Sequence, residues 1–192
     1  MRLICIGDSL TFGYGVHLSQ RWTRLCAQET GWELVNEGIN GDTTGGMLAR
    51  MQGGVLAELR EGGLGADRPY VLLMGGSNDV FYSGSDAAAR GNMGAMIHQL
   101  FSVGVLPMVG IPLPADAPHA PRAWAVAVDF EAAERTMKEY CAWLKRYCTA
   151  FGVPYIDFCA DFLSPDGSIR SELLLDGLHP TPEGHQIMAR RL

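Results

Sequence analysis

A serine follows directly after a short apolar run near the amino terminus, in the segment Gly7-Asp8-Ser9-Leu10. A serine hydroxyl needs a base within hydrogen-bond reach before it can act as a nucleophile, because it is not ionised near neutral pH. Serine and aspartate at such a position also commonly cap turns and helices. The position of Ser9 therefore indicates either a local cap or a nucleophile, and residues elsewhere in the chain must distinguish the two.

Among the five histidines, His179 is the best candidate for the base that Ser9 would need. Asp176 stands three residues earlier, so one turn of backbone can bring its carboxylate to Nδ1 and leave Nε2 free. An Asp-x-x-His spacing is common, and Asp176 also suits a simple turn with the glycine that follows it. We expect no orienting acid close in sequence to His17, His98 or His119, and a purely structural place for His185.

Acyl transfer also requires hydrogen-bond donors for the oxyanion that develops on the substrate, each worth about 3–4 kcal/mol when well aimed. Gly41 lies in the glycine-rich segment 37–46, where a backbone N–H can approach a ligand closely. Asn78 offers a side-chain amide in the segment 75–79. A tight turn at Gly41 and an Asx turn at Asn78 are the structural alternatives, and neither excludes a donor role.

The candidate residues follow short apolar segments that are typical of strands buried on both faces. The predicted strands are Leu3–Ile6, Glu33–Asn36, Tyr70–Met74, Val105–Ile111 and Tyr155–Phe158. Amphipathic helices alternate with these strands, which predicts right-handed crossovers and a parallel sheet covered on both faces. Ligands bind beyond the carboxyl ends of such strands, so we expect all the candidate residues on one rim of the sheet.

The predicted helices are recognised by their caps and by apolar stripes at helical spacing. One helix is expected between Ser19 as N-cap and a stop at Gly31, and the last helix is expected to begin at Thr181-Pro182. The second helix has the stripe Met47, Leu48, Met51, Val55, Leu56 and Leu59. The third has Met93, Met96, Ile97, Leu100 and Phe101 before Gly104, and the fourth runs from an Asp129 cap to Cys148. We interpret these methionine and aromatic stripes as core.

The motifs together resemble the GDSL or SGNH hydrolase family. Gly7-Asp8-Ser9-Leu10 is the GDSL motif, the run 76–79 fits the G-x-N-D pattern, and the blocks occur in family order between residues 7 and 179. The resemblance implies an α/β fold, namely a flavodoxin-like three-layer α/β/α architecture with a five-stranded parallel sheet. It also implies a serine esterase mechanism with no metal and no organic cofactor.

Residue by residue, the resemblance implies a triad of Ser9 as nucleophile, His179 as base and Asp176 as orienting acid. The implied oxyanion hole consists of the Ser9 and Gly41 backbone N–H groups and the Asn78 side-chain amide. Asp8 is not the triad acid in this interpretation.

Length and composition exclude several other classes of protein. The chain has 192 residues, which suits one domain over residues 1–192, and its net charge of −6 argues against sequence-independent nucleic-acid binding. No apolar run approaches the roughly 20 residues of a membrane span or the core of a signal peptide, so we expect a cytoplasmic protein without an integral membrane segment. Five cysteines without a C-x-x-C spacing predict buried reduced thiols.

The sequence predicts a hydrolase of carboxylic esters, with short-chain acyl or acetyl esters of small molecules or sugars as substrates. An acyltransferase, a thioesterase or a lysophospholipase could use the same triad. A flavodoxin-like binding module, with a phosphate in the loop Gly38–Gly46, is the alternative from another class. The loop Ile111–Pro121, with Phe12–Tyr14 and Phe81-Tyr82, is expected to line the site. The sequence does not specify the physiological ester, the acyl chain length or the oligomeric state.

Overall fold

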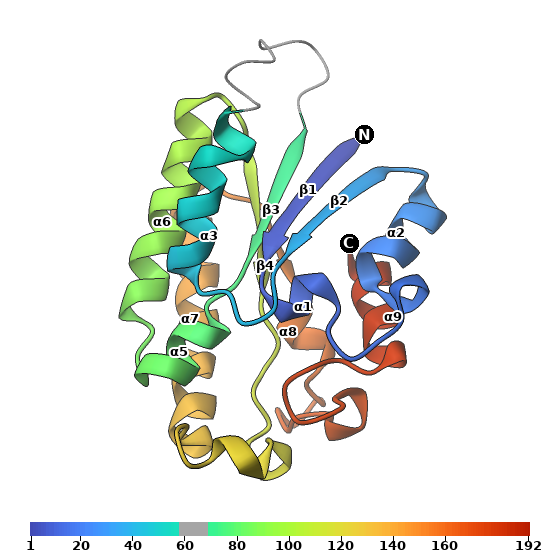
Figure 1. The fold of residues 1–192 in the computed structure, drawn as a ribbon, viewed down its shortest axis with the longest axis vertical. Helices are drawn as coiled ribbons and strands as arrows, with labels where there is room; N and C mark the ends of the chain where they lie inside the picture. Colours follow the sequence, from blue (N-terminus) through green and yellow to red (C-terminus); the bar gives the residue numbers. More distant parts are fainter. Residues whose placement is uncertain (58–68) are drawn as a thin grey trace.

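The computed structural model describes residues 1–57 and 69–192, and its centre is a five-stranded sheet between two helical layers (Figure 1). The strands are β1 (Arg2–Gly7), β2 (Glu33–Gly38), β3 (Tyr70–Met74), β4 (Pro107–Ile111) and β5 (Tyr155–Asp157). They are ordered β2-β1-β3-β4-β5, and every neighbouring pair is parallel. The predicted three-layer α/β/α fold with a five-stranded parallel sheet is confirmed.

Four of the five predicted strands differ from the observed strands at their ends: Leu3–Ile6 and Glu33–Asn36 are too short, and Val105–Ile111 and Tyr155–Phe158 are too long. Val105 does not belong to β4, because its N–H donates to the Leu100 carbonyl at the end of the preceding helix. Phe158 does not belong to β5, because Asp157 caps a short helix that begins at Phe158, accepting the Ala160 N–H at 3.1 Å.

The helices lie on the two faces of the sheet, as Figure 1 shows. The layer with the longer helices contains α3 (Thr44–Gly53), α5 (Ser77–Ser83), α6 (Ala87–Ser102) and α7 (Phe130–Phe151). The opposite layer contains α1 (Ser9–Phe12), α2 (Trp22–Thr30), α8 (Phe158–Asp161) and α9 (Pro182–Arg191). Leu59, expected at the end of the second helix, lies outside the described residues.

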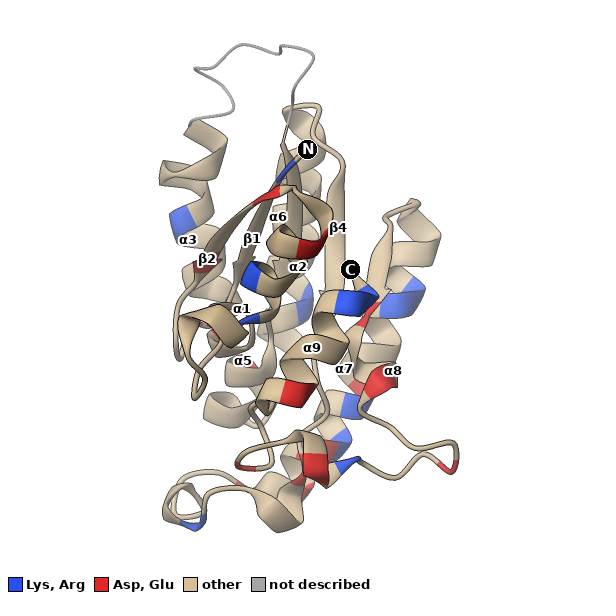
Figure 2. Ribbon diagram, turned by 90° about the vertical axis from the view of Figure 1, so that its right-hand side faces the viewer, with Lys and Arg blue, Asp and Glu red and all other residues tan. Residues whose placement is uncertain are grey.

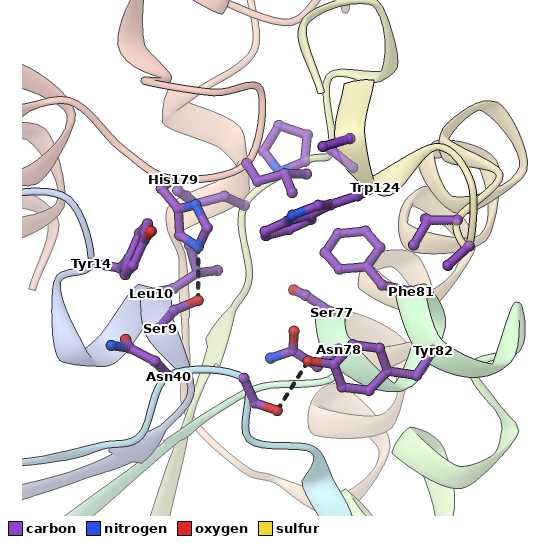
Figure 3. A pocket seen from close by; sticks show the side chains of 18 residues that line it. Ser9, Leu10, Tyr14, Asn40, Ser77, Asn78, Phe81, Tyr82, Trp124 and His179 are labelled. Atoms are coloured by element: carbon purple, nitrogen blue, oxygen red, sulfur yellow. Dashed lines mark hydrogen bonds between the residues drawn. The ribbon is translucent and has the colours of Figure 1, made fainter. Parts of the chain in front are cut away.

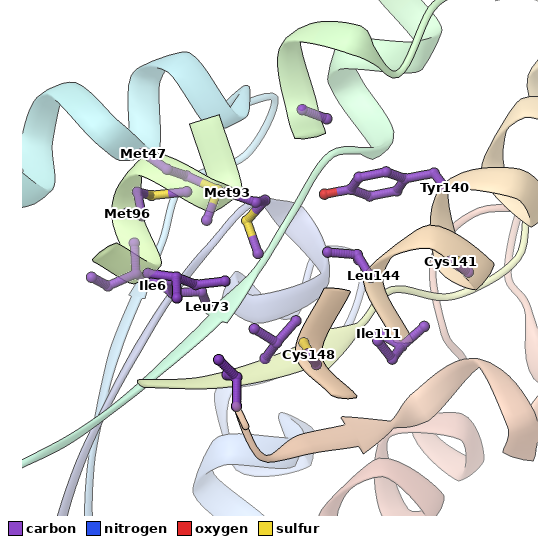
Figure 4. Packing of buried hydrophobic residues seen from close by; sticks show 14 of the residues in the cluster. Ile6, Met47, Leu73, Met93, Met96, Ile111, Tyr140, Cys141, Leu144 and Cys148 are labelled. Carbon is purple, nitrogen blue, oxygen red and sulfur yellow. The ribbon is translucent and has the colours of Figure 1, made fainter. Parts of the chain in front are cut away.

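Alternation along the strands divides the core into two clusters, one on each face of the sheet. In β1, Ile4 and Ile6 face the methionines of α3 and α6, whereas Leu3 and Cys5 face α2 and α9. Figure 4 shows Met47, Met93 and Met96 packed around Ile6 and Leu73. The methionine stripes are therefore core, as predicted, and burial on both faces holds the strand ends in fixed positions.

Two predicted N-caps and one predicted helix stop are confirmed. Asp129 accepts the Ala132 N–H at the start of α7, Thr181 accepts the Gly184 N–H at the start of α9, and Gly31 ends α2 in a left-handed conformation. The predicted Ser19 cap of α2 is wrong, because Ser19 lies in a separate 3-10 turn, Leu18–Gln20.

The first N–H of α2 is instead bound by a residue that is distant in sequence. Nδ1 of His185, in α9, accepts the Trp22 N–H at 3.3 Å. His185 therefore has the structural place expected for it, as a cap for α2.

The five cysteines, Cys5, Cys26, Cys141, Cys148 and Cys159, are free and buried, as predicted. Among residues 1–57 and 69–192, no helix has the length and apolar character needed to cross a membrane.

Candidate active site

A pocket of about 650 Å³ opens beyond the carboxyl ends of the strands. Four of the five predicted site residues line it: Ser9, Gly41, Asn78 and His179. Three of these follow three different strands, β1, β2 and β3, and His179 follows β5 after an intervening segment. The predicted placement on one rim is thus what the structure shows.

Ser9, His179 and Asp176 form one continuous chain of hydrogen bonds, of which Figure 3 shows the bond between Ser9 and His179. Ser9 Oγ lies 3.0 Å from His179 Nε2, and His179 Nδ1 lies 2.8 Å from Asp176 Oδ2. His179 is only 7% exposed, whereas Ser9 and Asp176 are half-buried. The arrangement leaves the hydroxyl between the imidazole and the open pocket, which is the geometry of a nucleophile with its base.

Asp176 is held as an ionised acceptor by its neighbours. Its Oδ1 accepts the backbone N–H groups of Leu178 at 3.1 Å and His179 at 2.8 Å. Burial alone would raise the pKa of Asp176, but the hydrogen bonds and the charge of His179 outweigh burial and lower the pKa below its ordinary value. A charged carboxylate at Nδ1 fixes the imidazole tautomer that leaves Nε2 as the acceptor for Ser9.

Local structure explains why Ser9 emerges at this point. β1 ends at Gly7, and the Asp8 side chain accepts the Leu10 N–H at 2.9 Å, which starts α1 with Ser9 as its first residue. Asp8 is fully buried, and burial raises its pKa to about 7. Asp8 is therefore a helix cap, and its carboxylate makes no hydrogen bond to His179 within the described part of the chain.

The Gly41 and Asn78 segments are joined to each other. Gly41 has a φ of +76°, a conformation that favours glycine, and its carbonyl accepts the Tyr82 hydroxyl at 3.4 Å. Asn78 Nδ2 donates one hydrogen to the Asp42 carbonyl at 2.9 Å and keeps a second hydrogen for another acceptor. Asn78 lies in the first turn of α5, a helix that the sequence pattern did not predict.

An arginine that sequence reasoning missed connects the Ser9 and Gly41 segments. Arg50 of α3 donates from Nη2 to the Gly7 carbonyl at 2.9 Å and from Nε to Asp42 Oδ2 at 2.8 Å. These two bonds tie the end of β1 to the loop after β2. Arg50 and Gly7 are 43 residues apart, so no local sequence signal could have identified the contact.

Asp79 and Thr44 connect the Asn78 segment to the same loop. The buried Asp79 carboxylate accepts the Thr44 backbone N–H at 2.9 Å and its hydroxyl at 2.7 Å. This carboxylate therefore occupies the N-terminus of α3, where the phosphate of a flavodoxin-like binding module would have to lie.

Tyr140 supports the Asn78 segment from below. Its hydroxyl, fully buried on α7, donates to the Gly75 carbonyl at 3.0 Å (Figure 4). The adjacent Gly76 has a φ of +116°, and a Cβ there would lie 2.4 Å from the Tyr140 ring. The glycines of this segment thus allow close packing under Asn78, a role that their sequence did not reveal.

The expectation that His119 has no orienting acid nearby is wrong. His119 Nδ1 lies 2.8 Å from Oδ2 of Asp116, which stands three residues earlier, the same spacing as in the Asp176–His179 pair. The His119 side chain is 61% exposed, and the residue is not among those that line the pocket. His119 therefore forms a local pair with Asp116, and no serine of residues 1–57 or 69–192 is hydrogen-bonded to its ring.

The walls of the pocket agree only partly with the prediction. Tyr14, Phe81 and Tyr82 line it, as expected, but Phe12 does not, because its ring packs under the Arg21 guanidinium at 4.0 Å. Of the loop Ile111–Pro121, only residues 113–115 contribute, and the wall continues with Ala123, Trp124, Ala127 and Val128. Within the two described ranges, no three His, Cys, Asp or Glu side chains cluster closely enough to hold a metal ion.

Comparison with known proteins places these features in a family. The sequence model of the GDSL-like Lipase/Acylhydrolase family matches residues 5–187. Esterase TesA of Pseudomonas aeruginosa strain PAO1 is 29% identical over an alignment of 185 residues, and the match covers 93% of this chain and 79% of that protein.

Solved structures share the fold at lower sequence identity. A member of the lipolytic protein G-D-S-L family from Veillonella parvula superposes with a TM-score of 0.77 at 22% identity, covering 100% of this chain and 95% of the other. The aryl esterase of M. smegmatis superposes with a TM-score of 0.78 at 20% identity, covering 98% and 94% of the two chains.

Proposed function

The chain belongs to the GDSL-like lipase/acylhydrolase family, and we propose that it hydrolyses carboxylic esters through an acyl-enzyme on Ser9. The observation that supports this most directly is the unbroken hydrogen-bond chain from Ser9 through His179 to Asp176 at the mouth of a pocket. A serine with its base and an orienting carboxylate is sufficient for acyl transfer when oxyanion donors lie beside it.

In the first half-reaction, Ser9 Oγ attacks the ester carbonyl carbon while His179 Nε2 removes the hydroxyl proton. The Ser9 and Gly41 backbone N–H groups and the free Asn78 amide hydrogen donate to the oxyanion of the tetrahedral intermediate. His179 then gives its proton to the alkoxy oxygen as the ester C–O bond breaks, and the alcohol leaves.

In the second half-reaction, water attacks the acyl-enzyme. His179 takes a proton from that water and returns it to Ser9 Oγ as the acid leaves, which restores the free enzyme. Asp176 stabilises the imidazolium form of His179 in both halves without accepting its proton. The hydrogen bonds of Arg50 and Asp79 hold Ser9 and the oxyanion donors at fixed relative positions in both half-reactions.

The replacement Ser9→Ala tests the proposal. We expect kcat for p-nitrophenyl butyrate to fall by at least about 10⁴-fold, with the circular dichroism spectrum and thermal midpoint retained, because the nucleophile is lost but the fold does not depend on it. Ser77→Ala is the matched control, since Ser77 lines the same pocket without a histidine partner, and we expect it to retain activity within about tenfold. A folded Ser9→Ala protein with wild-type activity would refute the proposal.

A further inference from the structure

The pocket has two sides, separated by the line from Ser9 to His179. Figure 3 shows Tyr14 on one side of this line and Trp124 and Phe81 on the other. The Tyr14 ring lies 4.6 Å from the His179 ring and is 47% exposed, so this side opens to solvent.

The direction of the proposed reaction assigns a part of the substrate to each side. His179 Nε2 must reach the alkoxy oxygen to protonate it, so the alcohol part of the ester lies on the His179 and Tyr14 side. The acyl part is attached to the opposite side of the carbonyl carbon. It therefore extends from Ser9 towards Phe81 and Trp124.

The acyl side is built from apolar residues at graded depth. Leu113 and Ala115 line the pocket and are each only 2% exposed, whereas the lining residues Phe81 and Val128 are half-buried. The turn 122–128 contributes Trp124 and Ala127 to the lining, and Figure 3 shows Trp124 beside Phe81. Two of these side chains are single methyl groups, which leaves space between the larger ones.

Charge is absent from the residues that line the pocket, apart from the titratable His179. The lining set contains no Asp, Glu, Lys or Arg among the described residues, and Figure 2 shows these residue types distributed over helices, strands and loops elsewhere in the fold. A phosphate or carboxylate on the substrate would find no countercharge here. The volume of about 650 Å³ also lies well within the range of sites for drug-sized ligands, far more than an acetyl group fills.

We propose that the acyl side binds a neutral hydrocarbon chain longer than acetyl, held between Phe81 and the turn 122–128, and that Trp124 and Ala127 set how long a chain it accepts. This inference rests on the proposed ester hydrolysis and specifies its substrate class. Each further methylene that enters the site raises kcat/KM about fourfold until the site is full, because the group leaves water for an apolar surface.

Two isomeric esters separate the acyl side from the alcohol side. Ethyl octanoate and octyl acetate have the same atoms, but the long chain is on the acyl part in the first and on the alcohol part in the second. We expect kcat/KM for ethyl octanoate to exceed that for octyl acetate by at least tenfold, measured by release of acid in a pH-stat below the solubility limit of each ester.

The outcomes of this experiment keep the two proposals apart. Equal rates, or a preference for octyl acetate, would overturn the acyl-side assignment while leaving ester hydrolysis in place. The proposed function itself would be refuted if the protein hydrolysed neither of these two esters and none of the p-nitrophenyl esters from acetate to decanoate.

Neighbouring residues of one turn provide matched variants. Ala127 lines the pocket, whereas Val126 beside it is 95% exposed. We expect Ala127→Leu to lower the ratio of kcat/KM for p-nitrophenyl octanoate over p-nitrophenyl acetate by about tenfold, because the larger side chain fills the acyl side. Val126→Leu is expected to leave the ratio unchanged.

Trp124→Ala tests the same proposed contact between the chain and the turn 122–128 by removing a side chain. Removing the indole deletes apolar contact with the chain, so we expect the octanoate-to-acetate ratio to fall about tenfold and the optimum to move towards longer chains. If neither Ala127→Leu nor Trp124→Ala changes the ratio in a folded protein, the chain does not lie against the turn and the inference is wrong.

Discussion

Two Asp-x-x-His motifs in this chain make the same local pair in different surroundings. Asp176 with His179, and Asp116 with His119, each join carboxylate Oδ2 to imidazole Nδ1 at 2.8 Å. Their burial is reversed: the His179 side chain is 9% exposed and its Asp 30%, whereas the His119 side chain is 61% exposed and its Asp 5%. Of the two histidines, only His179 has a serine at Nε2 among the residues that the structure describes.

The difference shows that an Asp–His pair forms from residues near in sequence, whereas the contact of His179 with Ser9 depends on the tertiary structure. Four residues in sequence are enough to orient an imidazole, because the carboxylate reaches Nδ1 within one turn. The partner at Nε2 comes from 170 residues away and depends on how β1 and the segment after β5 end on the same rim.

The two motifs also touch each other. The Asp116 backbone N–H donates to the Gly177 carbonyl at 2.8 Å, inside the Asp176–His179 motif. Gly177 has a φ of +76°, and a Cβ there would lie 2.6 Å from the Asp116 carbonyl oxygen. The second motif is thus placed to support the first, and the comparison can be tested from both sides.

The largest difference is expected between the two histidines. His179→Ala removes the proposed base, so we expect kcat/KM for p-nitrophenyl butyrate to fall by at least about 10⁴-fold. His119→Ala exposes no buried group to the pocket, and its kcat/KM should stay within about threefold of wild type. Equal losses in both variants would mean that the second pair takes part in the reaction.

The losses of activity on replacing the two aspartates should differ by less than those on replacing the two histidines. Asp176→Asn leaves the shape of the site but removes the charge that fixes the imidazole tautomer, so we expect kcat to fall by about 10³-fold with little change in KM. Asp116→Asn should lower kcat by less than tenfold, since its effect reaches the site only through packing.

Asp8→Asn is a further control for the Asp176 variant. The asparagine oxygen can still accept the Leu10 N–H, so we expect activity within about tenfold of wild type. An Asp8→Asn protein as inactive as Asp176→Asn would contradict the assignment of the triad acid.

Gly177→Ala tests the contact between the motifs. The new methyl group would overlap the Asp116 carbonyl in a backbone conformation that alanine disfavours, so we expect the free energy of unfolding to fall by about 3 kcal/mol. Gly167→Ala is the matched control, because Gly167 has a φ of +84° and open space where a Cβ would lie. It should cost about 1 kcal/mol in urea titrations, and equal losses would show that the close approach is unimportant.

The smallest expected effect is that of the buried His185 on the pH dependence of stability. Burial, with the charges of Arg21 and His179, lowers the pKa of His185 to about 4. Its neutral form is therefore favoured in the folded protein. The stability that this contributes is fully present above the unfolded pKa of about 6.5 and is lost as pH falls from there through about 4.

Urea titrations at pH 7.5 and pH 5 measure this contribution. We expect wild type to lose about 2 kcal/mol more between these pH values than His185→Asn, in which the amide oxygen can still accept the Trp22 N–H. Identical pH dependence in the two proteins would show that folding does not lower the pKa of His185.

The sequence by itself determined the features that depend on near neighbours and on alternation. Burial on both faces explains the apolar character of β1, β3 and β4, and caps such as Asp129 and Thr181 act on N–H groups three residues away. The pair Asp176–His179 was predictable for the same reason. The Asp116–His119 pair has the same local signal, although we expected no orienting acid close in sequence to His119.

Only the tertiary structure decided which of the two pairs meets Ser9. It also decided that Arg50 joins Gly7 to Asp42 and that His185 caps α2. The contacts of Arg50 with Gly7, of His185 with Trp22 and of Ser9 with His179 connect segments 43 to 170 residues apart, and they form only because each strand is fixed in the sheet by its neighbours. A sequence pattern specifies what a residue can bond, whereas sheet order and packing specify what lies within reach of it.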